Sequence, residues 1–312
     1  MHTSGNINPE RPARAGKVLS TLLNPDVASR LKNLELRARL VVEGFIAGLH
    51  KSPYHGFSVE FAEHRQYMPG DPVHTLDWKV FGKTDRYYVK EFEEETNLKC
   101  YLIMDCSGSM GYGSGRTTKF DYAQSLAAAL VYLMLHQRDA AGITAFTDRI
   151  IANIPARSAS NHLYVLLREL AGLKTGAVTD AAPVLHVMAE KIQRRGLVIL
   201  LSDLLTDPTQ VISGLKHFRH KRHEVIVFQI LDRQEREFGF PGAARFEDME
   251  TGEIIPTLPA QIRAAYRRQM NDMVGRYRRE CREARVDYHL LDTSVPFDRA
   301  LYAYLGKRAR MF

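Results

Sequence analysis

The sequence predicts a doubly wound α/β fold, in which helices cover both faces of a mostly parallel sheet. Three observations predict it. From residue 98 onward, short and almost continuously apolar runs alternate with amphipathic helical stretches, as buried parallel strands and their crossover helices do. Two of these apolar runs end in an acid, Asp105 and Asp203. The 312 residues are 45% hydrophobic, which is enough for a sizeable core.

The segment before residue 98 has a different pattern. Residues 1–25 are polar and interrupted by Pro and Gly, so we expect a flexible tail. Apolar residues recur at helical spacing over 27–49, which predicts a helix that breaks at one of its later glycines. Residues 53–96 are rich in aromatic residues and contain a short alternating run, which indicates a small β-containing segment. We expect residues 26–97 to pack on the main domain.

The main domain is expected to span residues 98–295. Short apolar runs predict its strands, at 98–105, 141–146, 150–154, 197–201, 224–231 and 286–291. Apolar stripes with a period near 3.6 predict its helices, at 119–137, 161–170, 183–193, 209–218 and 259–285. A hairpin insertion is expected near 233–258, and a C-terminal helix over 296–312, after Pro296.

Composition and cysteine usage bound the class of protein. The net charge of +7 is modest for this length and is typical of an ordinary basic surface. The three cysteines match no metal or redox spacing, so we expect reduced thiols and a cytoplasmic location. The first 25 residues contain no apolar segment of the signal-peptide kind, and no stretch reaches the roughly 20 apolar residues of a membrane helix.

The strongest local signal is Asp105-Cys-Ser107-Gly-Ser109, which follows an apolar strand and precedes a glycine-rich loop. An acid and two hydroxyls at alternate positions on a turn place their oxygens near one point, and hard oxygen ligands suit Mg²⁺. These three groups alone are too few for six-coordinate geometry. Thr179, in a loop before a helix, and Asp203, at the end of another apolar strand, are expected to complete the site.

This set of five residues resembles the metal-ion-dependent adhesion site of von Willebrand A-like domains. The resemblance implies that the hydroxyls of Ser107, Ser109 and Thr179 bind the metal directly, while Asp105 and Asp203 act mainly through bound waters. A carboxylate from a protein partner would take the remaining position. The metal implied is Mg²⁺, with Mn²⁺ and Ca²⁺ as alternatives. Thr175 competes with Thr179 for the threonine position.

Further motifs resemble the family of domain of unknown function fifty-eight, over roughly residues 40–305. They are Gly56–Phe61, Arg65–Asp71, Leu76–Lys79, Val89–Glu93 and Asp248–Gly252. The family pattern often has Arg where this chain has His74, which puts a role for that position in doubt. Members are commonly encoded beside MoxR-type AAA+ ATPases. The resemblance therefore implies such an ATPase as a partner, or a client protein that offers a carboxylate to the metal.

The expected function is a metal-dependent protein-binding module, an adaptor for protein remodelling or complex maturation, and not an enzyme. One alternative is a hydrolase that uses Asp105 as nucleophile, but phosphatases of that kind carry D-x-D, and the second acid is replaced here by Ser107. Another is nucleic-acid binding through the arginine-rich helix 261–285. That helix is also interpreted as a solvated face, or as a docking surface for an acidic partner.

Overall fold

The structure is a computed structural model, and it describes residues 34–49, 64–66, 82, 88–90, 98–159, 161–176, 181–249 and 252–311. The expected fold class is confirmed. A six-stranded sheet has the order β10-β7-β6-β3-β4-β5, and every neighbouring pair is parallel except β4 and the edge strand β5. Its strands are β3 (Lys99–Asp105), β4 (Ala140–Phe146), β5 (Ile150–Arg157), β6 (Leu197–Ser202), β7 (Glu224–Leu231) and β10 (Asp287–Asp292).

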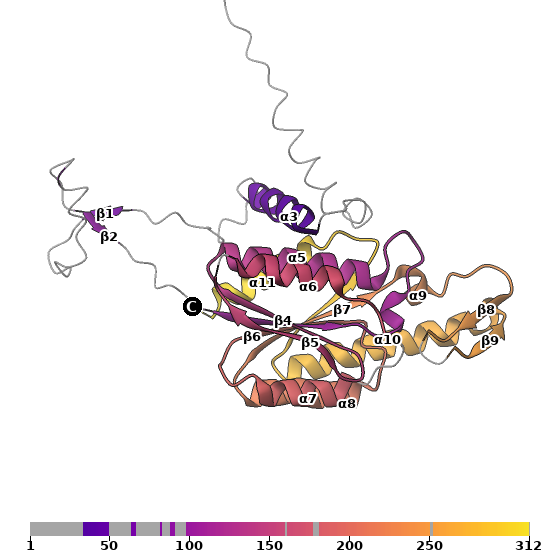
Figure 1. Ribbon diagram of the computed structural model, residues 1–312. Coiled ribbons are helices and arrows are strands. Elements are labelled where there is room, and N and C mark those ends of the chain that lie inside the picture. The colour runs from indigo at the N-terminus through magenta and orange to yellow at the C-terminus, as the bar shows by residue number, and fades with distance from the viewer. Residues whose placement is uncertain are drawn as a thin grey trace, which may run out of the picture.

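Helices cover both faces of this sheet (Figure 1). One face carries α5 (Lys119–His136), α6 (His162–Gly172) and α11 (Asp298–Ala309), and the outer helix α3 (Leu34–Leu49) packs against α5. The other face carries α7 (Ala181–Lys191), α8 (Pro208–His220) and α10 (Pro259–Glu283). This arrangement follows from the strand sequences, which are apolar on both sides and therefore need cover on both faces.

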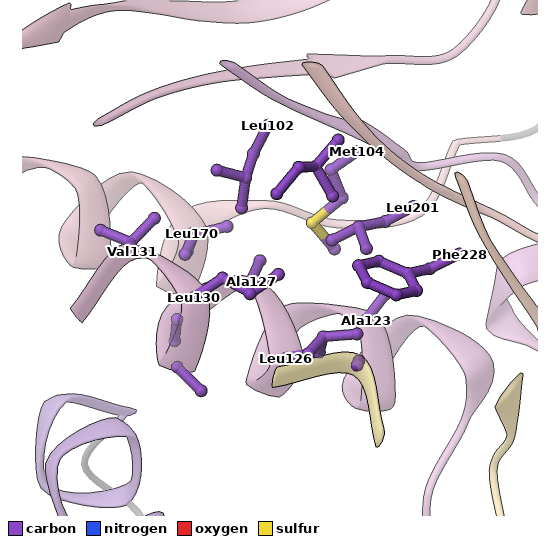
Figure 2. Packing of buried hydrophobic residues seen from close by; sticks show 14 of the residues in the cluster. Leu102, Met104, Ala123, Leu126, Ala127, Leu130, Val131, Leu170, Leu201 and Phe228 are labelled. Atoms are coloured by element: carbon purple, nitrogen blue, oxygen red, sulfur yellow. The ribbon is translucent and has the colours of Figure 1, made fainter. Parts of the chain in front are cut away.

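The central helix α5 covers the face of the sheet that it shares with α6 and α11. Its inner residues face β3, β6 and β7, where they pack on Leu102, Met104, Leu201 and Phe228 (Figure 2). Successive residues of β3 point to opposite faces, so Ile103, between Leu102 and Met104, joins the core under α7 and α8 instead.

Several elements differ from expectation. The helix α3 runs without a break through Gly44 and Gly48, and α9 (Arg233–Glu237) is a short helix that the apolar pattern did not predict. The expected hairpin is present as β8 (Ala244–Glu247) and β9 (Ile254–Thr257). The C-terminal helix α11 buries Leu301 and Tyr304 in the main core, together with Phe297 just before it, so it is an integral layer of the domain.

Little of the N-terminal β-containing segment is described. β1 (His64–Gln66) and β2 (Tyr88–Lys90) form an antiparallel pair in which Arg65 lies opposite Val89. Two of the family motifs therefore meet in one hairpin. The rest of the Arg65–Trp78 segment, including His74, lies outside the described residues, as does the expected tail over 1–25. The domain boundaries stay a prediction. None of the helices that the structure describes has the length and apolarity to cross a membrane.

Candidate metal centre

The candidate site lies at the point where the strand order reverses. The chain passes from β3 to β4 and β5 on one side, and then returns to β6, β7 and β10 on the other. Loops that leave neighbouring strands in opposite directions open a crevice at the carboxyl ends of those strands, where ligands bind in such folds. Asp105 ends β3 and Asp203 directly follows β6, so the sheet itself brings the two predicted acids to this crevice.

Four of the five predicted residues form one hydrogen-bonded chain. The Ser107 amide donates to Asp105 Oδ1 at 2.9 Å, and the Ser107 and Ser109 hydroxyls lie 3.0 Å apart. The Ser109 hydroxyl in turn donates to Asp203 Oδ2 at 2.7 Å. Asp105, Ser107 and Asp203 are almost completely buried, with 2%, 1% and 2% of their surface exposed. We call Asp105, Ser107, Ser109 and Asp203 the acid–hydroxyl cluster.

Burial shapes the electrostatics of the cluster. Burial, followed by the negative charge of Asp203, raises the pKa of Asp105 to about 7, although hydrogen bonds from Ser202 and Ser107 act in the opposite direction. A positive ion placed between the two acids would oppose both causes. The pKa of the neighbouring Cys106 thiol is raised to about 12, because the side chain is buried and lies near Asp105. Cys106 therefore has little thiolate character, which makes it a poor nucleophile.

Three polar residues at the cluster were not expected from the sequence. Ser202 Oγ donates to Asp105 Oδ2 at 2.5 Å, and Lys119 Nζ lies 2.8 Å from Asp203 Oδ2. Lys119 also contacts both carboxylate oxygens of Glu235, at 2.8 and 3.0 Å. Ser202 was detectable, since it directly precedes Asp203. Lys119 lies on the buried face of its helix together with Ala123, so the sequence indicated a charged side chain that points into the protein. Nothing in the sequence indicated Glu235 as its partner.

The loop after Ser109 is anchored to α9. Asp232, which caps α9, accepts hydrogen bonds from the Ser114 amide at 3.0 Å and the Ser114 hydroxyl at 2.7 Å. It also accepts one from Thr293 Oγ1 at 3.2 Å. Burial raises the pKa of Asp232, but these bonds and one from Gln234 outweigh burial and hold the pKa below its ordinary value. The glycine-rich loop is thus attached to a fixed carboxylate, that of Asp232.

The fifth predicted residue of the site is Thr179, which lies outside the described residues. Its competitor Thr175 lies beside the loop that follows Ser109, because a methyl group added to Gly111 would lie 3.5 Å from Thr175 Oγ1. The next residue, Gly176, donates its amide to the Cys106 carbonyl at 2.7 Å. The backbone at Thr175 and Gly176 is therefore tied to the segment that carries Ser107 and Ser109.

The chemistry of the donor set fits a divalent cation with hard-ligand preferences. All four donors of the acid–hydroxyl cluster are oxygens, and they converge on one crevice. The described residues contain no group of three or more Asp, Glu, His and Cys arranged to hold a metal. A transition-metal site with several imidazoles or thiolates is thus not formed by this part of the chain. Asp105, Asp203 and Glu235, set against the single ammonium of Lys119, leave a formal charge of −2.

The C-terminal turns of the arginine-rich helix α10 lie away from this cluster. Its last turns line a groove of about 690 Å³ together with Glu224 and Asp287, which begin β7 and β10. The groove therefore lies at the amino ends of the strands, whereas the cluster lies at their carboxyl ends. Arg219, Lys307 and Arg310 neutralise those two acids at 2.7 to 3.2 Å. The groove is also lined by Arg278, Arg282 and Arg285.

Comparison with known sequences finds relatives over most of the chain. The uncharacterised protein Rv1480 of Mycobacterium tuberculosis is 28% identical over 234 residues, which are 74% of this chain and 73% of Rv1480. The uncharacterised protein YeaD of Bacillus subtilis is 29% identical over 108 residues, which are 34% of this chain and 25% of YeaD.

Solved structures of similar shape have low sequence identity. The conserved hypothetical protein BatB from Bacteroides thetaiotaomicron aligns with a TM-score of 0.47 at 15% identity, over 68% of this chain and 99% of BatB. The VWA domain of SpRpn10 aligns with a TM-score of 0.36 at 12% identity, over 63% of this chain and 88% of that domain. The family model described as "Protein of unknown function DUF58" matches residues 63–274. The chain therefore belongs to the DUF58 family.

Proposed function

We propose that this protein is a metal-dependent protein-binding module, in which the acid–hydroxyl cluster holds Mg²⁺. One observation carries the proposal: two buried acids and two hydroxyls from distant parts of the chain form one connected set at the switch point of the sheet. Buried polar groups of this kind are costly unless they are paired or bind an ion. Two buried acids and two hydroxyls at the crevice where ligands bind in such folds are best explained by a bound ligand.

Each residue has a role that follows from its position. Ser107 and Ser109 would offer their hydroxyl oxygens directly, since they face one another across 3.0 Å. Asp105 and Asp203 would contribute negative charge without binding the metal directly. The carboxylate of Asp105 already accepts a hydrogen bond from Ser202, and that of Asp203 accepts one from Lys119. Bound there, Mg²⁺ would supply an electrophilic position for a carboxylate, because neutral hydroxyls leave its charge weakly neutralised.

The geometry does not favour a hydrolase. Both oxygens of Asp105 already accept hydrogen bonds, one from the Ser107 amide and one from the Ser202 hydroxyl. A carboxylate that is 2% exposed and held in this way is poorly placed for attack on a substrate. The position of a second acid is taken by Ser107, so no general acid stands beside Asp105 in the motif. Binding, rather than turnover, is the activity that these residues support.

The proposed partner is a MoxR-type AAA+ ATPase, or a client of such an ATPase, that presents an Asp or Glu side chain to the site. The test is the affinity of the purified chain for the MoxR-type ATPase of the same organism. The ATPase itself needs Mg²⁺ with its nucleotide, so chelation is a poor control. We therefore compare wild type with Asp105→Ala and Ser107→Ala in the same Mg²⁺ buffer.

Both variants are expected to keep the circular dichroism spectrum of the folded chain and to lose binding. The matched control is Thr144→Val, which removes a hydroxyl bonded to Asn153 at 2.9 Å in the sheet but touches no residue of the cluster. Binding of Asp105→Ala with wild-type affinity would refute the proposal.

The basic groove supports a second, additional contact for an acidic partner. Arg278, Arg282 and Arg285 line a concave surface. The two acids of this groove, Glu224 and Asp287, are already paired with the cations Arg219, Lys307 and Arg310. Concave basic surfaces concentrate positive potential. Nucleic-acid binding at this groove would fall steeply with salt, whereas a flat salt response would exclude it.

A further inference from the structure

The acid–hydroxyl cluster contains a cation of its own. The Lys119 side chain is completely buried, and its ammonium contacts Asp203 Oδ2 at 2.8 Å and Glu235 Oε1 at 2.8 Å. Two carboxylates within hydrogen-bond distance stabilise the charged form of this buried side chain, so Lys119 is present as an ammonium. A buried, charged lysine thus lies within the proposed site.

The position of this ammonium is unfavourable for the helix that carries it. Lys119 is the first residue of α5, whose amino end has positive dipole character and disfavours a cation. A capping box between Thr118 and Asp121 fixes this end of the helix, with bonds of 3.0 and 3.1 Å. Buried ion pairs contribute little net stability compared with apolar packing. Stability alone therefore does not account for a lysine here.

The oxygen that Lys119 contacts is the one through which Asp203 joins the acid–hydroxyl cluster. Asp203 Oδ2 accepts a hydrogen bond from the Ser109 hydroxyl at 2.7 Å and from the Lys119 ammonium at 2.8 Å. The negative charge that would attract a metal is thus shared with a tethered cation. Glu235 gives that cation a second partner through both of its oxygens, so the ammonium stays paired if Asp203 is withdrawn.

We propose that Lys119 sets the metal affinity of the cluster by competing for Asp203, and that Glu235 relieves this competition by holding the ammonium. This inference rests on the proposed function, since it concerns the same site. Lys119 and Glu235 are positioning residues, because they act through Asp203. The competition keeps affinity for the metal low until a partner's carboxylate adds its own charge.

The test measures the Mg²⁺ dependence of thermal unfolding of the full chain, since a ligand that binds only the folded state raises the Tm. Lys119→Met removes the competitor and should tighten Mg²⁺ binding by about tenfold or more. Glu235→Gln leaves the ammonium with Asp203 alone and should weaken Mg²⁺ binding by about tenfold. A residue with a merely structural role would not shift affinity in opposite directions in these two variants.

The matched control is Lys307→Met. Lys307 is also largely buried and also pairs with two acids, Glu224 at 2.7 Å and Asp287 at 3.2 Å, but at the opposite edge of the sheet. This variant should bind Mg²⁺ as wild type does. If Lys119→Met does not fold, Glu235→Gln carries the test, because it keeps the buried Lys119–Asp203 pair.

The outcomes separate the two proposals. Binding of wild-type strength in both Lys119→Met and Glu235→Gln overturns the competition but leaves the metal site in place. Binding that is absent in wild type and present in Lys119→Met supports the competition, and shows that Lys119 replaces the metal in the native chain. Absence of Mg²⁺ binding in every variant overturns both proposals.

Discussion

At the residue scale, the site is a balance of buried charges. Asp105 and Asp203 lie within one hydrogen-bonded chain, and burial, followed by the negative charge of Asp203, raises the pKa of Asp105 to about 7. One ammonium, from Lys119, offsets part of this negative charge. The cluster therefore combines strong attraction for a cation with an internal competitor. Small changes in any of these three side chains are expected to have large effects on metal affinity.

A buried histidine predicts how stability depends on pH. His223 is 1% exposed and its Nε2 lies 3.1 Å from the Ile192 carbonyl. Burial lowers the pKa of His223 from its ordinary value of 6.5, so below pH 6.5 the unfolded chain takes up a proton that the folded chain does not. The free energy of unfolding should thus decrease as pH falls from about 6.5 toward the lowered pKa of the folded state.

Urea unfolding at pH 7.5 and pH 5 measures this effect. His223→Gln should lose less stability than wild type between the two pH values, although the substitution weakens packing at both. His220→Gln, which changes an exposed histidine of the same helix end, should behave as wild type does. An equal loss of stability in His223→Gln and wild type would show that another group is responsible.

At the element scale, α10 holds the loop that carries Asp203. Leu204 has a left-handed backbone with φ of 55°, which is a costly conformation for leucine. The surrounding contacts hold the loop in place: Tyr277 Oη donates to the Leu204 carbonyl at 3.1 Å and to the Thr206 carbonyl at 3.3 Å. Gln229 Nε2 donates to the Asp203 carbonyl at 2.7 Å. Through Tyr277, the helix α10 therefore helps to fix the position of Asp203.

Tyr277→Phe tests this positioning. The variant removes both bonds to the loop, which should cost about 1 kcal/mol of unfolding free energy and should weaken Mg²⁺ binding. Tyr122→Phe is the matched control, because Tyr122 is also buried and also donates to a backbone carbonyl, that of Val295, at 3.1 Å. It should lose similar stability and keep its Mg²⁺ affinity. The two measurements are chemical denaturation and Mg²⁺ titration. Equal Mg²⁺ affinity in both variants would contradict the role of Tyr277.

Most of these elements, but not α9, could be predicted from the sequence. The six strands of the main sheet were predicted because short apolar runs bounded by polar residues are typical of strands in an α/β fold. α9 was missed because five residues, Arg233–Glu237, carry no apolar period. Its helical form depends on the cap at Asp232, whose further bonds come from Ser114 and Thr293, distant in sequence.

The same limit applies to the candidate site. Asp105 and Asp203 could be placed together, because the carboxyl ends of parallel strands share one edge of the sheet. Glu235 could not be placed, because its contact with Lys119 spans 116 residues and depends on how α9 packs. The position of Thr179 stays a prediction.

At the scale of the whole molecule, two candidate functional surfaces lie at opposite ends of the strands. The acid–hydroxyl cluster lies at the carboxyl ends of the strands, and the groove lined by Arg278, Arg282 and Arg285 lies at their amino ends. Met249, which follows β8, lies beside the loop after Ser109, since a methyl group added to Gly111 would lie 3.1 Å from Met249 Cε. We expect a partner that docks at the carboxyl ends of the strands to meet Met249 as well as the candidate metal site.

Calorimetric titration of the metal-stripped chain with Mg²⁺, for wild type, Asp105→Ala and Thr144→Val, is the most direct test of a metal site in the acid–hydroxyl cluster. We expect saturable, one-site binding for wild type and Thr144→Val, and no binding for Asp105→Ala when circular dichroism shows that this variant is folded. Unchanged Mg²⁺ binding in folded Asp105→Ala would mean that the metal is held elsewhere on the chain and that the cluster is not its site.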